Sequence, residues 1–210
     1  MKIALFGGTF DPIHVGHLKA AAAAVRGFSL DRVLFVPSGH PPHKTREPLT
    51  AFDHRYSMVS LACAGNPRFI PSLLEAPRPG NKVCYSVDTV RRVRQNLKPN
   101  DKLYFLIGID AFLDIHTWRS WQKLFQLVNF IVVSRPGFAR KPIPEPTRKE
   151  LAATKTTLHY LNGIRETASA RAIRQAARRS GSLTKWVPGP VAEYIRKARL
   201  YSPKRAEFSK

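Results

Sequence analysis

The first 37 residues place two short apolar runs on either side of an alanine-rich segment. Lys2–Phe6 is apolar and ends in two glycines, and Arg32–Pro37 is a second apolar run. Between them, His17–Arg26 has high helix propensity and stops at Gly27. A strand, a helix and a second strand in this order predict a βαβ unit, in which a helix crosses over between two parallel strands.

The same alternation continues along most of the chain. Valines recur at helical spacing within 86–97, whereas 103–107 and 130–133 are compact apolar runs typical of buried strands. Further helices are expected at 52–64, 120–127, 169–179 and 191–198, further strands at 69–72 and 157–161, and a proline-rich loop at 136–146. The pattern predicts an α/β fold: a doubly wound, Rossmann-like parallel sheet with a small helical C-terminal portion.

Length and composition suit one domain with a substantial core. The chain has 210 residues, of which 43% are hydrophobic, so we expect a single domain over 1–200 and a basic tail at 201–210 that frays. No stretch reaches the roughly 20 consecutive apolar residues of a membrane-spanning helix, and the start does not resemble a signal peptide. The only cysteines are Cys63 and Cys84. So few thiols suit a reducing compartment, and a cytoplasmic location without a membrane partner is expected.

The chain is strongly basic, with a formal net charge of +21. Residues 139–210 alone contain 17 basic and 5 acidic residues. The positive electrostatic potential of such a chain concentrates polyanions near its surface, whether nucleic acids, acidic lipids or nucleotide triphosphates. A simpler interpretation of the charge is that it keeps the protein soluble. Composition alone does not decide between these interpretations.

The segment GGTFDPIHVGH (residues 7–17) lies where the first strand ends and the first helix begins. In doubly wound folds, ligands bind at the carboxyl ends of the strands. Glycines allow backbone N–H groups to approach phosphate oxygens, and a helix N-terminus adds positive potential. His14 and His17 are spaced to share one helix face, with Gly16 leaving room between them. We therefore expect this segment to face a ligand crevice.

Several kinds of site could use these two histidines. A zinc site needs at least a third ligand, and no Cys, Asp or Glu stands nearby at an obvious metal spacing. A dinucleotide fingerprint needs G-x-G-x-x-G, which is absent. Phosphate binding by the imidazoles remains, beside the simpler interpretation that both histidines only shape and cap the turn. The chemistry of the residues leaves these two interpretations open.

Five segments, in order along the chain, resemble one enzyme family. GGTFDPIHVGH is similar to the signature of the HxGH nucleotidyltransferase superfamily, whose histidines contact nucleotide phosphates. The others are VPSGHPPHK (36–44), YSVDTV (85–90), LIGIDAFLDIHTW (106–118) and VVSRPG (132–137). Together they resemble the bacterial nicotinate-nucleotide adenylyltransferases over nearly the whole chain. The HxGH motif by itself is less specific, because pantetheine-phosphate adenylyltransferases and cytidylyltransferases share it.

The resemblance implies a reaction between ATP and nicotinate mononucleotide that forms nicotinate adenine dinucleotide and pyrophosphate. The attacking group is a phosphate oxygen, so no activated serine or cysteine is required. Catalysis would rest on in-line positioning and on stabilising charge at the α-phosphate. Mg²⁺ is expected with ATP, held largely by phosphate and water oxygens, so no protein metal cage is predicted.

The resemblance also assigns roles to individual residues. The expected catalytic contacts are His14, His17, Lys44 and Arg174. The expected ATP contacts are Gly7, Gly8, Thr9, Phe10, Gly16, Ser169 and Arg171. The expected mononucleotide contacts are Asp88, Thr89, Gly108, Asp110, Trp118 and Arg135, with Trp118 stacking on the pyridine ring. Simpler roles compete: a solvated loop lysine for Lys44, helix caps for Asp88, Thr89 and Asp110, and a core position for Trp118.

One segment departs from the family pattern. Family members usually show I-S-S-T-x-I-R where this chain has Ala168-Ser169-Ala170-Arg171-Ala172-Ile173-Arg174. Two hydroxyl groups that would clasp the ATP phosphates are thus lost, and one guanidinium is gained. Arg171 could offer a bidentate phosphate contact, or it could point to solvent and leave ATP binding weaker.

Other functions are compatible with the same fold. The acceptor could be nicotinamide mononucleotide or phosphopantetheine in place of nicotinate mononucleotide. The charge and the altered segment also allow a basic nucleic-acid-binding protein, but the basic residues lack the regular aromatic interleaving that stacks bases, so nucleic acid is not the expected partner. The sequence leaves the oligomeric state open.

Overall fold

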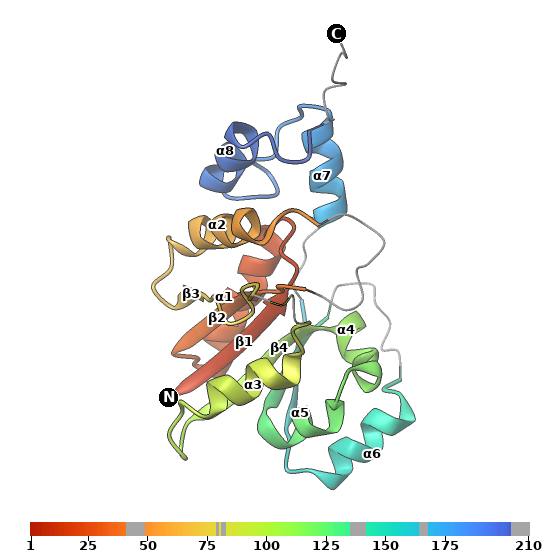
Figure 1. Ribbon diagram of the computed structural model, residues 1–210. Helices are drawn as coiled ribbons and strands as arrows, with labels where there is room; N and C mark the ends of the chain where they lie inside the picture. Colours follow the sequence, from red (N-terminus) through yellow and green to blue (C-terminus); the bar gives the residue numbers. More distant parts are fainter. Residues whose placement is uncertain (41–48, 79, 81–82, 135–141, 164–167, 203–210) are drawn as a thin grey trace.

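The computed structural model describes residues 1–40, 49–78, 80, 83–134, 142–163 and 168–202 (Figure 1). Within them, one parallel sheet has the strand order β3-β2-β1-β4-β5-β6. The strands are β1 (Lys2–Gly8), β2 (Arg32–Pro37), β3 (Phe69–Pro71), β4 (Lys102–Gly108), β5 (Asn129–Val133) and β6 (Leu158–Leu161). The order reverses between β1 and β4, as in a doubly wound Rossmann fold, and this confirms the predicted fold class.

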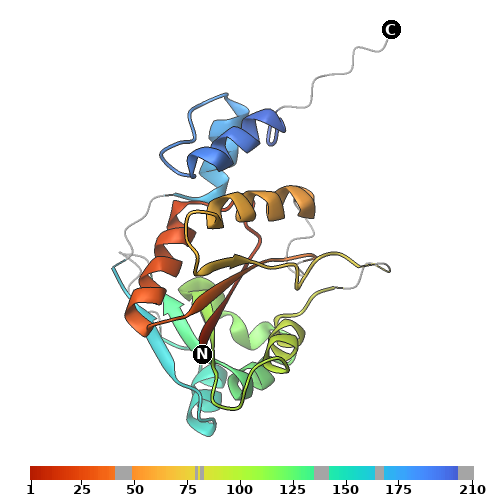
Figure 2. The same ribbon diagram turned by 90° about the vertical axis from the view of Figure 1, so that its left-hand side faces the viewer.

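Helices cover both faces of the sheet. The described helices are α1 (Val15–Phe28), α2 (Phe52–Cys63), α3 (Ser86–Arg94), α4 (Ile109–Leu113), the 3₁₀ turn η1 (Ile115–Thr117), α5 (Trp121–Leu127), α6 (Glu145–Ala153), α7 (Ala170–Arg178) and α8 (Gly189–Lys197). Helices α1 and α2 pack on one face, and α3 and α5 pack on the other (Figures 1 and 2). Helices α7 and α8 form a small group beyond α2, as the predicted helical C-terminal portion requires.

Strand β1 shows why the sheet is buried on both sides. Ala4 and Phe6 belong to the core shared with α1, α2, α7 and α8, whereas Ile3 and Leu5 belong to the core shared with α3 and α5. Side chains alternate between the two faces of a strand, so a continuous apolar run supplies both cores. This arrangement leaves the carboxyl ends of the strands as the place where a site can form.

Some element ends differ from those expected. Helix α1 continues through Gly27 and ends at Phe28. Its C-cap residue, Ser29, adopts a left-handed conformation with φ of 51° and donates its N–H to the Val25 carbonyl oxygen. Helix α3 ends at Arg94 and not at Leu97. Helix α6 was not predicted: Glu145 and Pro146, assigned to a loop, form its first turn, where proline is favoured because its missing N–H is not needed. Residues 136–141 of that expected loop lie outside the described residues, and 142–144 form no helix or strand.

The start of the expected C-terminal tail is packed. Tyr201 was assigned to the fraying tail, yet its hydroxyl donates to the Asp11 carboxylate at 2.6 Å. Burial raises the pKa of the Tyr201 hydroxyl, and the neighbouring Asp11 raises it further. Residues 203–210, the remainder of the predicted tail, lie outside the described residues.

Candidate active site

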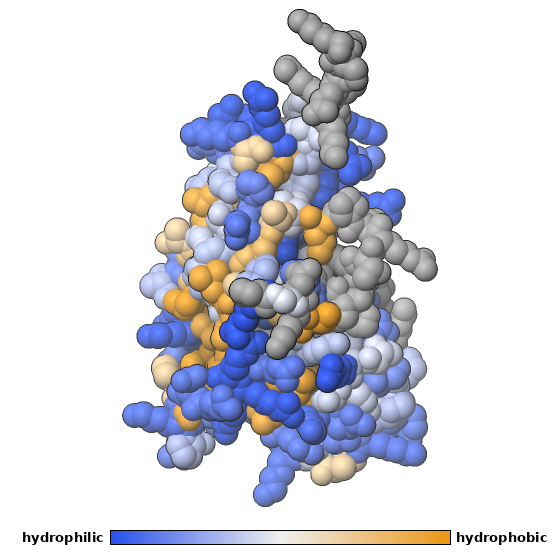
Figure 3. All heavy atoms as spheres, viewed as in Figure 1, coloured by the Kyte–Doolittle hydropathy of each residue, from blue (hydrophilic) through white to orange (hydrophobic). Residues whose placement is uncertain are grey.

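Two cavities lie side by side at the carboxyl edge of the sheet. The larger has a volume of about 540 Å³ and the smaller about 220 Å³. Gly7, near the end of β1, and Gly108, at the end of β4, line both of them. These strands flank the point where the strand order reverses, which is where doubly wound folds bind their ligands. On the face seen in Figure 3, hydrophilic residues predominate at the upper and lower ends and hydrophobic residues gather mainly between them.

Aromatic and cationic side chains line the larger cavity. Trp118 contributes its indole ring, which meets Phe105 edge to face with ring centroids 6.2 Å apart. The Arg119 guanidinium lies 4.5 Å from the centre of the Tyr85 ring, and both side chains border the cavity. A cation over an aromatic face is held electrostatically by the ring. The larger cavity therefore offers flat surfaces for an aromatic ring and a positive charge beside them.

Glu75 is a residue of this cavity that sequence analysis missed. It is 8% exposed, and its Oε1 accepts a hydrogen bond from the Thr89 hydroxyl at 2.8 Å. Burial raises the pKa of the Glu75 carboxyl, while the Thr89 hydrogen bond and the nearby Arg92 charge oppose that shift. A β-carbon on Gly39 would lie 2.0 Å from the Glu75 carbonyl oxygen, so only glycine lets these two segments approach. The available signal was an acidic residue shortly after the predicted strand at 69–72.

The smaller cavity is lined by His14 and His17, the two histidines of the HxGH segment, and is called the histidine cavity below. His14 occupies the N-cap position of α1 and is 6% exposed. The His14 and His17 rings are stacked, with centroids 3.7 Å apart and planes 26° apart. Phe10 meets the His17 ring nearly at a right angle, with centroids 5.0 Å apart. The two imidazoles are therefore held as a pair at the positive end of a helix whose first turn has no acidic residue.

One hydrogen bond defines the tautomer of His17. The backbone N–H of His14 donates to Nδ1 of His17 at 3.2 Å. A ring nitrogen that accepts a hydrogen bond holds no proton, so a neutral His17 has its proton on Nε2. With its proton on Nε2, a neutral His17 can only donate a hydrogen bond through that atom, and His17 lines the smaller cavity.

The remaining expected ATP contacts fall at several positions. Gly16 lines the histidine cavity, whereas Gly8 and Thr9 line the larger one. Phe10 is buried at 2% exposure and supports the His17 ring. At the start of α7, the Ser169 hydroxyl caps the helix by accepting from the Ala172 N–H at 3.2 Å. Ala168, just before that cap, also lines the histidine cavity.

The two arginines of α7 lie in different surroundings. Arg171 is exposed and lines neither cavity. Arg174 is half-buried, and its guanidinium donates to the Asp11 carbonyl oxygen at 2.8 Å. The structure thus gives Arg174 a contact with the loop that precedes His14. Lys44, expected to contribute to catalysis, lies outside the described residues.

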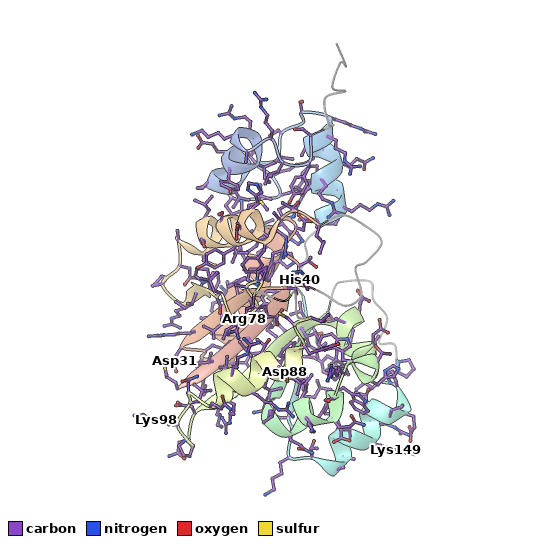
Figure 4. All side chains as sticks on the ribbon, in the orientation of Figure 1. Asp31, His40, Arg78, Asp88, Lys98 and Lys149 are labelled. Carbon is purple, nitrogen blue, oxygen red and sulfur yellow. The ribbon has the colours of Figure 1, made fainter. Side chains whose placement is uncertain are left out.

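The expected mononucleotide contacts are divided between the cavities. Thr89, Gly108 and Trp118 line the larger cavity, while Asp110 lines the histidine cavity. Asp88 lies on α3 (Figure 4), lines neither cavity and pairs with Arg91 at 3.2 Å. Arg135 lies outside the described residues.

The described residues contain neither a metal-binding cluster of protein side chains nor a membrane-spanning helix. No three His, Cys, Asp or Glu side chains in this part of the chain are grouped so that they could hold a metal ion. No helix in it has the length and apolar character needed to cross a membrane.

The fold and the histidine cavity are typical of nucleotidyltransferases, and comparison with known proteins supports this class. The cytidylyltransferase-like family model matches residues 5–176. A probable nicotinate-nucleotide adenylyltransferase of Solibacter usitatus is 43% identical, with 96% of this chain and 100% of the relative covered. One of Thermus thermophilus is 41% identical, with the same coverage of both chains. The chain belongs to the nicotinate-nucleotide adenylyltransferase family.

A solved structure agrees on the fold. The nicotinic acid mononucleotide adenylyltransferase of Plasmodium falciparum, complexed with NaAD, superimposes with a TM-score of 0.74 at 20% sequence identity. The match covers 95% of this chain and 97% of that one. The agreement in fold therefore extends over nearly the whole length of both chains.

Proposed function

We propose that this chain transfers the adenylyl group of ATP to nicotinate mononucleotide, forming nicotinate adenine dinucleotide and pyrophosphate in NAD biosynthesis. The observation that carries the proposal is that two cavities of different chemistry share Gly7 and Gly108. The larger, with Trp118 and Tyr85, suits a pyridine mononucleotide, and the smaller, with His14 and His17, suits the phosphates of ATP. Two substrates seated in this way meet over the shared glycines.

The reaction needs little covalent help from the protein. A phosphate oxygen of the mononucleotide attacks the α-phosphorus of ATP, the bond from that phosphorus to the bridging β-oxygen breaks, and pyrophosphate leaves. Because the nucleophile is already an anion, the protein must align it and stabilise charge in the transition state. Holding two bound reactants in the attacking geometry can supply a large part of such a rate enhancement.

The histidine pair and the start of α1 supply the electrostatic part. We assign Nε2–H of His17 to an ATP phosphate oxygen, with His14 stacked beside it. Fixed donors that face developing negative charge are already oriented when the reaction occurs, so they stabilise the transition state without reorganisation. Lys44, Arg135 and Arg174 are proposed as further cationic contacts to the nucleotides. Arg171 is proposed to reach the phosphates from the first turn of α7, three residues after Ala168 in the cavity wall.

The larger cavity would select the mononucleotide. Trp118 is proposed to stack on the pyridine ring, since it presents an aromatic surface at the cavity wall. Thr89, in the first helical turn of α3, lines the larger cavity. We propose that Thr89 and Asp88 present the N-terminus of that helix to the mononucleotide. Backbone N–H groups or a local positive charge such as Arg119 would favour the carboxylate of nicotinate over the amide of nicotinamide.

Mg²⁺ is expected to accompany ATP. A magnesium ion usually keeps several waters and is held by substrate phosphates with one or two carboxylates. Asp110 provides the only carboxylate among the described residues that line the histidine cavity, so the donor set fits such an ion. Asp110 would hold it directly or through a coordinated water, and the ion would neutralise charge on the triphosphate. A cytoplasmic location remains a prediction.

The test is pyrophosphate release by the purified protein with ATP, Mg²⁺ and a panel of acceptors. Nicotinate mononucleotide should be the preferred acceptor over nicotinamide mononucleotide and phosphopantetheine. If either of the other two acceptors is turned over preferentially, the proposed acceptor is wrong, but the proposed reaction, adenylyl transfer, stands. No turnover with any acceptor, together with tight salt-dependent binding of DNA or RNA, would overturn the enzymatic function.

A further inference from the structure

Asp11 connects the loop before the histidines to the distant C-terminal portion. Asp11 is 4% exposed and lies three residues before His14. Its Oδ1 accepts from the Tyr201 hydroxyl at 2.6 Å, and its Oδ2 accepts from the Thr50 N–H at 3.2 Å. Its carbonyl oxygen accepts from the Arg174 guanidinium at 2.8 Å. The carboxylate and the carbonyl of one loop residue are thus held from separate parts of the chain.

A buried arginine holds the same loop from the α2 side. Arg55 is 1% exposed, and it donates through Nε to the Thr50 carbonyl and through a terminal nitrogen to the Thr9 carbonyl, both at 2.8 Å. Between Thr9 and Asp11, Phe10 adopts a left-handed backbone conformation with φ of 48°. A bulky residue is disfavoured in that region, so contacts from outside the loop must maintain the conformation.

The C-terminal portion, residues 168–202, supplies several of these contacts from outside the loop. Besides Tyr201 and Arg174, the Trp186 carbonyl accepts the N–H of Val15, the first residue of α1, at 2.8 Å. These groups therefore fix both the loop and the start of the helix that bears His14 and His17. Burial raises the pKa of Tyr201, which keeps its hydroxyl protonated and able to donate.

We propose that Tyr201 is a positioning residue for adenylyl transfer: its hydrogen bond to Asp11 holds the 9–14 loop so that the histidine pair faces the ATP phosphates. The inference rests on the proposed function, and it assigns a role to a residue that lies 190 positions from its partner and lines neither cavity. Without the Tyr201 hydroxyl, the Asp11 carboxylate loses a donor in a buried place, and the loop would spend time in arrangements that cannot align ATP.

Tyr201→Phe and Tyr194→Phe form a matched pair for the test. The Tyr194 hydroxyl and Nδ1 of His54 are 2.9 Å apart and join α8 to α2, so Tyr194→Phe also removes a hydroxyl contact of the C-terminal portion but does not touch the loop. We expect Tyr201→Phe to lower kcat/KM for ATP by about three- to tenfold, the effect of losing one such hydrogen bond, with KM for nicotinate mononucleotide within about twofold of wild type. Tyr194→Phe should lower only thermal stability.

Amide hydrogen exchange provides a second readout that does not require turnover. Exchange at residues 9–17 should be faster in Tyr201→Phe than in wild type and unchanged in Tyr194→Phe, measured well below the melting temperature of each protein. If the two variants match each other in ATP kinetics and in exchange, Tyr201 has only a structural role and the inference is overturned. If wild type itself fails to release pyrophosphate with any acceptor, the proposed function fails, whereas the exchange comparison still decides whether Tyr201 holds the loop.

Discussion

Gly7 and Gly108 lie at the carboxyl ends of two neighbouring parallel strands, and each borders both the larger cavity and the histidine cavity. A β-carbon on Gly7 would come within 3.8 Å of the Phe105 ring, and one on Gly108 would meet nothing within 4 Å. The glycines therefore leave an unobstructed floor on which the ends of two bound substrates can meet.

His17→Ala tests the role of the histidine pair. We expect kcat to fall by about 10²- to 10³-fold, the usual effect of removing one donor that stabilises transition-state charge. His159→Ala serves as the control, because His159 packs against Phe28 away from both cavities and should leave turnover near wild type. Steady-state pyrophosphate release and circular dichroism would be measured on both variants. Activity near wild type in a folded His17→Ala protein would remove His17 from the mechanism.

Trp118→Ala tests the stacking surface of the larger cavity. Loss of an aromatic surface beside a base typically costs about 1–3 kcal/mol, so KM for nicotinate mononucleotide should rise by roughly tenfold while KM for ATP stays nearly constant. Trp121→Ala is the matched control, since Trp121 packs on Phe125 with ring centroids 5.7 Å apart and lines neither cavity. Equal effects of the two substitutions on the mononucleotide KM would show that Trp118 acts only through packing.

Arg171→Ala tests whether the guanidinium replaces the hydroxyl groups missing from the start of α7. We expect KM for ATP to rise by about three- to tenfold, as the loss of a charge-assisted hydrogen bond at a partly exposed place would cause. Arg178→Ala in the last turn of the same helix removes an equal charge far from the helix start. An ATP dependence of Arg171→Ala that equals the control would mean that Arg171 serves only as a solvated surface charge.

Glu75→Gln tests the buried carboxyl of the larger cavity through pH. Burial raises the pKa of Glu75 above its usual 4.5, so the folded protein retains this proton over a range in which the unfolded chain has lost it. The contribution of Glu75 to the free energy of unfolding is therefore fully present below about pH 4.5. It is lost as the pH rises through the raised pKa. The free energy of unfolding of Glu75→Gln minus that of wild type should therefore increase as the pH rises over that range.

Urea unfolding of both proteins at several values between about pH 4 and pH 8 would measure this difference. Glu193→Gln is the control: Glu193 is exposed, and its pKa is lowered by the hydrogen bond from Lys197 and by that lysine's charge. It should show no such increase with pH. A pH-independent difference between Glu75→Gln and wild type would contradict a buried, proton-retaining carboxyl.

Most helices and strands could be predicted because their signals are local. The valines of α3 and the apolar runs of β4 and β5 specify their own conformation through spacing alone. Helix α6 was missed because Pro146 was interpreted as a loop residue, although proline also suits a first helical turn. Helix α1 was expected to end at Gly27, but Ser29 terminates it, since the helix end depends on how Leu30 enters the core.

The sequence by itself determined the order of the strands and of most helices, the histidine pair at the end of the first strand, and the family to which the chain belongs. Only the tertiary structure decided which residues share a cavity: Asp110 joins the histidines, Gly8 and Thr9 line the larger cavity, and Glu75 and Arg119 enter it. The tertiary structure also brought Tyr201 to Asp11. Periodicity and motifs report neighbours along the chain, whereas contacts between distant residues follow from the order of strands in the sheet and from the packing of helices against it.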